Sequence, residues 1–233
     1  MNIALILAGG QGSRMGQDIP KQFIHVENRP VILYTLLALQ HHPEIDRIQA
    51  VCLAGWEKVL WGYARQFGIN KLQDVIEGGD TRFLSTRRGM ESLKAADEDV
   101  IIVHDSVRPL VTAESLSDTI AVCRRYGNSM TILPCADTMY EKSGEFYTSK
   151  EAPRAKLVRG QTPEAVTGRR MKEMYLAADE KNIRLDSISA LQNALGWNIH
   201  FARGSERNIK LTTTEDIELF RALLTIKKEE WLK

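Results

Sequence analysis

Residues 7–16 read LAGGQGSRMG, and residues 20–23 read PKQF. The apolar run 3–7 predicts a short buried strand. The glycines that follow it let backbone N–H groups close around an anion without interference from a Cβ atom. Arg14 and Lys21 bring positive charge to the same loop. Residues 7–16, which we call the cradle, are therefore predicted to bind phosphate.

Two other interpretations of the cradle are weaker. An ordinary glycine turn explains the glycines but not the neighbouring cations. A dinucleotide-binding G-x-G-x-x-G loop competes as well, because Gly10, Gly12 and Gly16 fit it loosely. Pro20 argues against that loop, since the dinucleotide motif runs straight into a helix whose N-terminus holds the pyrophosphate.

The bulk composition favours a single domain spanning residues 1–233. With 43% hydrophobic and 26% charged residues, the chain can bury a full core. The net charge of +1 suggests neither nucleic acid nor an anionic membrane as a partner. The three scattered cysteines, Cys52, Cys123 and Cys135, favour a reducing compartment, and the apolar N-terminal run is too short for an anchor. A soluble cytoplasmic protein is expected.

Beyond the cradle, predicted strands alternate with predicted helices. Strands are expected at 48–53, 73–76, 100–103, 129–133 and 197–202, and helices at 30–40, 56–67, 83–93, 112–125, 171–178 and from 212 onward. The all-apolar run 100–103 implies burial on both faces, which places it centrally in a parallel sheet. The pattern predicts an α/β fold, with a Rossmann-like, mostly parallel sheet and helices on both faces.

Asp105 follows the strand 100–103 and is a candidate metal-binding residue. Open α/β sheets bind ligands beyond the carboxyl ends of their strands, so Asp105 should lie level with the cradle. A carboxylate there can help to hold Mg²⁺ against triphosphate oxygens. The alternative, in which Asp105 only caps a turn or pairs with Arg108, stays open.

Two later segments have more than one interpretation from their residues alone. Gly78-Gly79-Asp80 fits a turn followed by a helix cap as well as it fits a ligand-binding loop. The polar segment 137–158 cannot build a core of its own. Loops this long are usually functional or mobile, and an extended hairpin that needs a partner fits equally.

The cradle and PKQF motifs resemble the signature of sugar-nucleotide and polyol-nucleotide pyrophosphorylases. Among these, the chain is most similar to the cytidylyltransferases that act on 2-C-methylerythritol 4-phosphate or ribitol 5-phosphate. The resemblance continues through G-G-x-x-R-x-x-S at 78–85, H-D-x-x-R-P at 104–109, G-Q-T-P at 160–163 and N-I-K-x-T at 208–212. It therefore covers nearly the whole chain.

The resemblance implies that CMP is transferred from CTP to a polyol phosphate with release of pyrophosphate, in the presence of Mg²⁺. It implies catalytic cations at Arg14, Lys21 and Lys210, a nucleotide site at Ala8, Gly9, Gly10, Gly12, Gly79, Asp80 and Ser85, and substrate contacts at Asp105, Thr138 and Arg154, with Asp105 also beside the metal. It further implies a homodimer in which the arm at about 137–158 reaches into the neighbouring subunit.

The identity of the polyol phosphate is less certain. Both branches normally begin the segment at 185 with T-D, and the methylerythritol branch continues with E-A, whereas this chain has Leu185, Asp186 and Ser187. Trp56 and the 104–109 and 160–163 motifs favour ribitol 5-phosphate or a related alditol phosphate. The alternatives are 2-C-methyl-D-erythritol 4-phosphate as the substrate, an inactive nucleotide-binding paralogue and, least favoured, a dehydrogenase.

Overall fold

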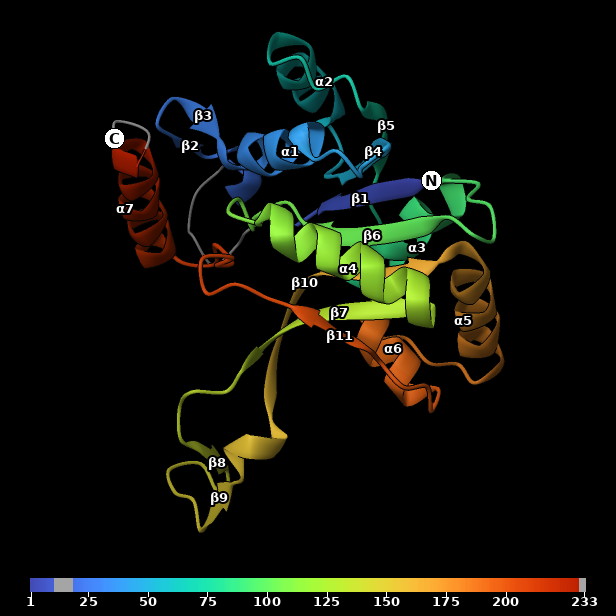
Figure 1. Ribbon diagram of the computed structural model, residues 1–233, viewed down its shortest axis with the longest axis vertical. Helices are drawn as coiled ribbons and strands as arrows, with labels where there is room; N and C mark the ends of the chain where they lie inside the picture. The colour runs from blue at the N-terminus through green and yellow to red at the C-terminus, as the bar shows by residue number, and fades with distance from the viewer. Residues whose placement is uncertain (11–18, 231–233) are drawn as a thin grey trace.

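The protein has a central sheet flanked by helices (Figure 1). The computed structural model describes residues 1–10 and 19–230, with side chains up to residue 226. Within that part of the chain, seven strands form one sheet in the order β11-β7-β10-β6-β1-β4-β5. In chain order, β1, β4, β5, β6, β7, β10 and β11 span Asn2–Ala8, Arg47–Cys52, Leu72–Glu77, Val100–Asp105, Asn128–Pro134, Val158–Thr167 and Phe201–Arg203.

The helices follow the predicted alternation, with α6 as an unpredicted addition. Helices α1 to α7 span Val31–His41, Glu57–Gln66, Arg82–Ser92, Ala113–Tyr126, Gly168–Glu180, Ile188–Ala194 and Thr214–Glu230. A 3-10 turn, η2, covers Lys21–Phe23, and a short hairpin pairs β2 (His25–Val26) with β3 (Arg29–Pro30). No helix in the described ranges is both long enough and apolar enough to cross a membrane.

The strand pairing confirms a mostly parallel sheet. Strand β1 pairs in parallel with β4 and β6, and β4 pairs in parallel with β5. Strand β10 is antiparallel to both of its neighbours, β6 and β7. The run 100–103 is therefore central and buried as predicted, but one of its two neighbours is antiparallel. The arm returns the chain directly from β7 into β10, and such a connection joins antiparallel strands.

The two faces of the sheet carry separate apolar cores, because successive side chains of a strand point to opposite faces. In β1, Ala4 and Ile6 face the core built with α1, α2 and α4. Ile3 and Leu5 face the core built with α3, α5 and α6. Helices therefore cover both faces, which confirms the predicted layers (Figure 1).

Two local predictions need correction. The final strand β11 starts at Phe201 and not at 197, since Trp197 N donates to Gln192 O and so ends the α6 turn. Helix α7 starts at Thr214 and not at 212. The Asp216 carboxylate accepts hydrogen bonds from the backbone N–H groups of 212 and 213 at 2.6 and 2.8 Å and so caps α7 from within its first turn.

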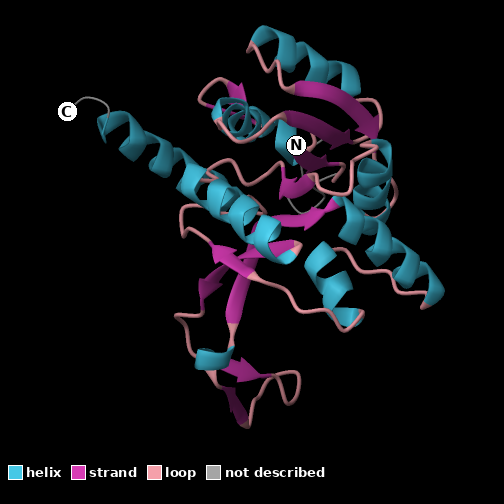
Figure 2. Cartoon of the chain, turned by 45° about the vertical axis from the view of Figure 1, so that its right-hand side comes forward, coloured by secondary structure: helices cyan, strands magenta, loops and turns pink. Residues whose placement is uncertain are grey.

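The segment 137–158 forms a protruding arm (Figures 1 and 2). Strands β8 (Met139–Glu141) and β9 (Lys150–Ala152) pair in antiparallel fashion at its tip, and the 3-10 turn η3 (Arg154–Lys156) leads back to the sheet. Phe146 and Tyr147 at the tip are 91% and 68% exposed. An extended hairpin is therefore present, while its contact with a second subunit remains a prediction.

Candidate active site

A pocket of about 580 Å³ lies at the edge of the sheet where β1, β4, β5 and β6 end. Parallel pairing brings these ends level, since Leu7 pairs with Asp105 and Ala8 pairs with Cys52. The predicted site residues that line this pocket are Gly9, Gly10, Lys21, Gly79, Asp80, Ser85, Asp105 and Lys210. Motifs from distant parts of the chain thus meet where open α/β sheets bind ligands.

The described part of the cradle is held in shape by Gln22. Its side-chain Nε2 donates hydrogen bonds to the carbonyl oxygens of Ala8, at 2.7 Å, and Gly10, at 3.0 Å. Gln22 is only 1% exposed, and its bond to Ala8 O is shielded from water, whereas Gly10 is exposed. The predicted cradle residues Gly12 and Arg14 lie outside the described residues.

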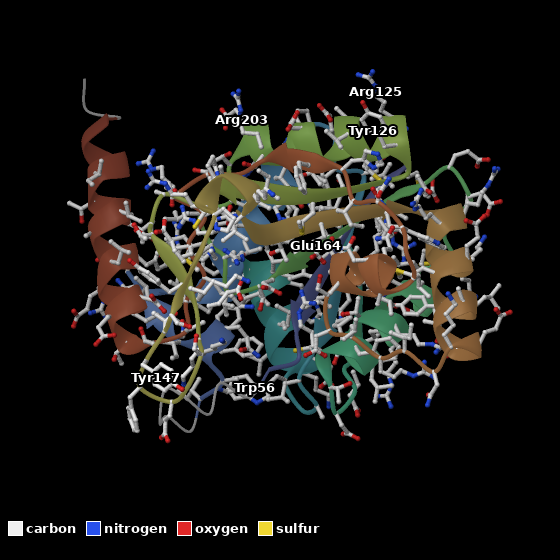
Figure 3. The ribbon with its side chains drawn as sticks, turned by 90° about the horizontal axis from the view of Figure 1, so that it is seen from below. Trp56, Arg125, Tyr126, Tyr147, Glu164 and Arg203 are labelled. Carbon is white, nitrogen blue, oxygen red and sulfur yellow. The ribbon has the colours of Figure 1, made fainter. Side chains whose placement is uncertain are left out.

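Gln22 was not among the predicted site residues, although it lies within the PKQF motif. The signal that marks it is an uncharged polar residue between Lys21 and the buried Phe23. The Phe23 ring anchors the motif, stacking on Trp56 with the ring centroids 4.5 Å apart. Trp56 lies at the start of α2 (Figure 3). The turn that presents Lys21 is therefore fixed by packing beneath it.

The resemblance implies CTP as the ligand of the cradle, so replacing Gln22 with alanine should raise the KM for CTP about ten-fold, because a buried carbonyl left without its donor costs about 1–3 kcal/mol. The two carbonyls belong to the cradle, so the cradle would lose its shape before the rest of the site. Pyrophosphate release at varied CTP measures the effect. The exposed Gln73 provides the matched control, Gln73→Ala. An unchanged KM for CTP in Gln22→Ala would show that the cradle holds its shape without this side chain.

The loop after β5 combines both interpretations left open by its sequence. Thr81 caps α3, accepting a hydrogen bond from Leu84 N at 3.1 Å. The Ser85 hydroxyl accepts from Gly79 N at 3.0 Å and donates to Gly79 O at 3.1 Å, which ties the loop to the helix. A Cβ at Gly79 would come within 2.6 Å of the Leu84 Cβ, so only glycine fits there. Gly79, Ser85 and the exposed Asp80 all line the pocket.

Asp105 lies at the centre of a cluster of cations. Its Oδ1 is 3.1 Å from Arg82, and its Oδ2 is 2.8 Å from Lys210 and 3.8 Å from Arg108. Burial alone would raise the pKa of Asp105. The charges of Arg82 and Lys210 outweigh that effect and hold the pKa of this carboxyl well below its usual range. Asp105 is therefore ionised. It pairs with Arg82 and Lys210 as well as with Arg108, the partner considered from the sequence.

Lys210 reaches this cluster from a loop near the C-terminus. Leu211 N donates to Val107 O at 2.9 Å, which ties the loop to the end of β6. Asn208 is fully buried and donates to Thr162 O at 2.8 Å. These bonds present the Lys210 ammonium at the pocket although its side chain is 40% exposed.

The structure does not bring Thr138 and Arg154 to the pocket of their own chain. Both lie in the arm and are exposed. The Arg154 guanidinium donates to Ala136 O at 3.0 Å, a contact within the arm. If Thr138 and Arg154 contact the substrate as predicted, they do so in a pocket other than that of their own chain.

Asp105 is the candidate ligand for Mg²⁺. Among residues 1–10 and 19–230, no group of three or more His, Cys, Asp or Glu side chains is arranged to hold a metal ion. Mg²⁺ commonly binds through one or two carboxylates and takes its other ligands from substrate phosphates and water. An ionised carboxylate in a pocket lined by the predicted phosphate cradle fits that pattern, with Asp105 as the candidate protein ligand.

Comparison with known proteins identifies relatives along the whole chain. The family model described as "IspD: 2-C-methyl-D-erythritol 4-phosphate cytidylyltransferase" matches residues 2–226. A protein named ribitol-5-phosphate cytidylyltransferase, from Lacticaseibacillus paracasei, is 42% identical over 233 residues, covering 98% of this chain and 100% of that protein. One named 2-C-methyl-D-erythritol 4-phosphate cytidylyltransferase, from Alkaliphilus metalliredigens, is 31% identical over 97% of this chain and 96% of its own length.

The fold has relatives among solved structures as well. The crystal structure of 4-diphosphocytidyl-2C-methyl-D-erythritol synthase from Anaerococcus prevotii superimposes with a TM-score of 0.80 at 26% identity. The match covers 96% of this chain and 98% of the other. The sheet and its flanking helices are thus shared along almost the full length.

Proposed function

The chain belongs to the IspD family of cytidylyltransferases, and from this premise we propose that it transfers CMP from CTP to ribitol 5-phosphate or a related alditol phosphate. The reaction class is that of the family, namely nucleotidyl transfer to a polyol phosphate. The observation that carries the choice of polyol is the 42% identity to a ribitol-5-phosphate cytidylyltransferase over its whole length, against 31% for the methylerythritol relative.

In the proposed reaction, an oxygen of the polyol phosphate attacks the α-phosphorus of CTP. The bond from that phosphorus to the bridging oxygen breaks, and pyrophosphate leaves. The attacking phosphate is already ionised, so the site has to align two polyanions and offset their repulsion. We assign Lys21 and the cradle to the triphosphate, Lys210 to the α-phosphate, and Gly79, Asp80 and Ser85 to the cytosine. Arg14 would add a second cation to the triphosphate.

Mg²⁺ forms part of this proposal, with Asp105 as its protein ligand. A bound Mg²⁺ would neutralise phosphate charge and polarise the phosphoryl oxygens. Asp105 Oδ2 is paired with Lys210 at 2.8 Å. A triphosphate would offer Lys210 a competing anion, and that exchange would leave a carboxylate oxygen available for a metal.

The protein should require a divalent cation and should prefer CTP over ATP, GTP and UTP. The cradle contacts only phosphate, whereas the loop of Gly79, Asp80 and Ser85 is the part assigned to the base. Pyrophosphate release with each nucleotide, with and without a chelator, measures both requirements. Equal turnover of all four nucleotides would contradict the assignment of that loop, and full activity in excess chelator would remove the metal from the proposal.

The principal alternative substrate is 2-C-methyl-D-erythritol 4-phosphate. It is supported by the family description and by the relative from Alkaliphilus. Ser187 departs from the methylerythritol pattern, whereas Leu185 departs from both branches and does not discriminate between the two substrates. A panel of polyol phosphates at saturating CTP should give ribitol 5-phosphate the highest kcat/KM. A higher kcat/KM for the methylerythritol phosphate would make it the proposed substrate and the alditol phosphate the alternative.

An inactive nucleotide-binding paralogue is the alternative from a different class of function. Such a protein would keep the cradle but lose the cations that act on phosphorus. Lys21, Asp105 and Lys210 are all present and line one pocket, which supports an active enzyme. CTP binding without pyrophosphate release for any polyol phosphate would favour the paralogue.

The proposal also includes a homodimer and a cytoplasmic location. The arm supports the dimer, because a polar hairpin without a core of its own needs a partner for stability. The free cysteines Cys52, Cys123 and Cys135 support a reducing compartment.

A further inference from the structure

Glu164 is a buried carboxyl for which the proposed reaction has no use. It lies on β10 in the interior of the molecule (Figure 3) and is only 5% exposed. The pairing of β10 with β7 shifts register between Gln161 and Glu164, and such irregularities redirect side chains. Glu164 Oε1 accepts a hydrogen bond from the Ser187 hydroxyl at 2.6 Å. Its Oε2 is buried and accepts no hydrogen bond of normal geometry among the described residues, although the Ser189 hydroxyl lies near enough to lower the pKa of Glu164.

Ser187 connects this carboxyl to the pocket. It caps α6, and the preceding Asp186 accepts a hydrogen bond from Phe83 N at 3.2 Å. The Arg82 guanidinium donates to the backbone oxygen of Asp186 and also pairs with Asp105 at 3.1 Å. Segment 185–187 is thus fastened at one end to Glu164 and at the other to an arginine that lines the pocket.

The sheet order decides which part of the pocket this chain of contacts supports. In the sequence β10-β6-β1-β4-β5, the loop assigned to cytosine follows β5 at one side. Glu164 lies on β10, one strand beyond Asp105 of β6, at the other side. Segment 185–187 does not itself line the pocket, but it holds Arg82, which lines the pocket and pairs with Asp105 on the side left for the second substrate.

The surroundings of Glu164 favour a neutral carboxyl. Burial raises its pKa, and the nearby charge of Asp105 raises it further. The Ser187 hydrogen bond and the Arg82 charge act in the opposite direction but do not cancel that rise. The cations around Asp105 lower its pKa, so the pKa values of the two neighbouring carboxyls are pushed apart, as in other paired acids.

We propose that Glu164 is a positioning residue, which acts through Ser187 to hold segment 185–187 against the arginine that lines the pocket and so sets the affinity for the polyol phosphate. This inference rests on the proposed function. The methylerythritol pattern has a glutamate at the position of Ser187, whereas in this chain the carboxyl beside that position is that of Glu164 on β10. A glutamate at position 187 would place a second carboxyl opposite Glu164 in a buried site, which would be strongly unfavourable.

The test measures kcat and the KM for each of the two substrates separately. Glu164→Ala and Ser187→Ala should each raise the KM for the polyol phosphate about ten-fold, with kcat and the KM for CTP within about two-fold of wild type, because each removes the hydrogen bond between these two side chains. Ser187→Ala also removes the cap of α6, so the double variant should be no worse than Ser187→Ala alone. Glu164→Gln and Ser187→Thr keep an acceptor and a hydroxyl and should restore most of the affinity.

Asp99 provides the control for burial. It is a carboxyl with 5% exposure just before β6, at the opposite end of that strand from Asp105, and it pairs with the N-terminus. Asp99→Asn should lower the melting temperature without changing the KM for the polyol phosphate. If Glu164→Ala does not fold, the Glu164→Gln and Ser187 variants still decide the question.

Three results would overturn the inference. The first is an unchanged KM for the polyol phosphate in Ser187→Ala. The second is an equal rise in the KM for CTP. The third is a loss in Glu164→Gln as large as in Ser187→Ala, which would rule out a neutral hydrogen-bonded group. Failure of the proposed function looks different, because the wild-type protein would then release no pyrophosphate with any polyol phosphate.

Discussion

Lys210→Ala should lower kcat/KM by about 10²–10³-fold, the range seen when one preorganised electrostatic contact is removed from a transition state. The Lys210 ammonium lies 2.8 Å from Asp105 Oδ2 at the end of β6, level with the cradle. Its charge is therefore available where phosphate charge develops. Steady-state pyrophosphate release with CTP and ribitol 5-phosphate measures the loss. Lys21→Ala should show a loss of similar size, since Lys21 lines the same pocket.

Stability should change little in Lys210→Ala. The Lys210 side chain is 40% exposed, and pairs that involve exposed charges contribute little to folding. Asp105 keeps Arg82 as a partner at 3.1 Å. Lys58, an exposed lysine on α2, provides the control Lys58→Ala, which should have wild-type kcat/KM. A fully active Lys210→Ala would place this lysine on the surface and outside the mechanism.

Arg154→Ala should also lower kcat/KM by about 10²–10³-fold. Part of the activity should return when a subunit with an intact Arg154 pairs with the variant subunit. The exposed Arg154 lies in the arm, away from the pocket of its own chain. We propose that it reaches the substrate phosphate of a second copy in a two-fold dimer. Mixing Arg154→Ala with Lys210→Ala under conditions that exchange subunits would then create one doubly damaged site and one intact site in each mixed dimer.

The recovered activity can be estimated from chain statistics. At equal input about half of the dimers are mixed, and half of their sites are intact, so roughly a quarter of the wild-type activity should return. If Arg154 serves its own subunit, every site keeps one lesion and no activity returns. Fluorescence energy transfer between differently labelled variants has to confirm that exchange occurred. Activity that stays at the level of the separate variants, with exchange confirmed, would leave the arm a structural role only.

Local sequence patterns were enough to predict most of the elements and most of the pocket. The apolar run 3–7 predicted β1, and the helix expected at 112–125 is α4, which Thr112 caps by accepting a hydrogen bond from Ser115 N. Gly79 was expected in a loop, and a Cβ there would meet Leu84. These features depend on residues a few positions apart, because periodicity, capping and glycine conformation are local.

The sequence alone also determined the family, since the motifs of the cradle, 78–85, 104–109 and 208–212 occur in its order and spacing. It pointed to a parallel sheet whose carboxyl ends form the site. Short motifs carry this information because backbone N–H groups and a few charges are enough to bind phosphate.

Only the tertiary structure decided which groups act on one another. Asp105 pairs with Arg82 on α3 and with Lys210 on a C-terminal loop. Its contact with Arg108 is longer than either of these. The antiparallel insertion of β10 beside β6 brings Glu164 close to the same carboxylate. Such contacts depend on strand order and direction, and these arise from packing of the whole chain and not from any local pattern. The charge states of Asp105 and Glu164 follow from that packing, because burial and neighbouring charges shift a pKa only once the chain has folded around it.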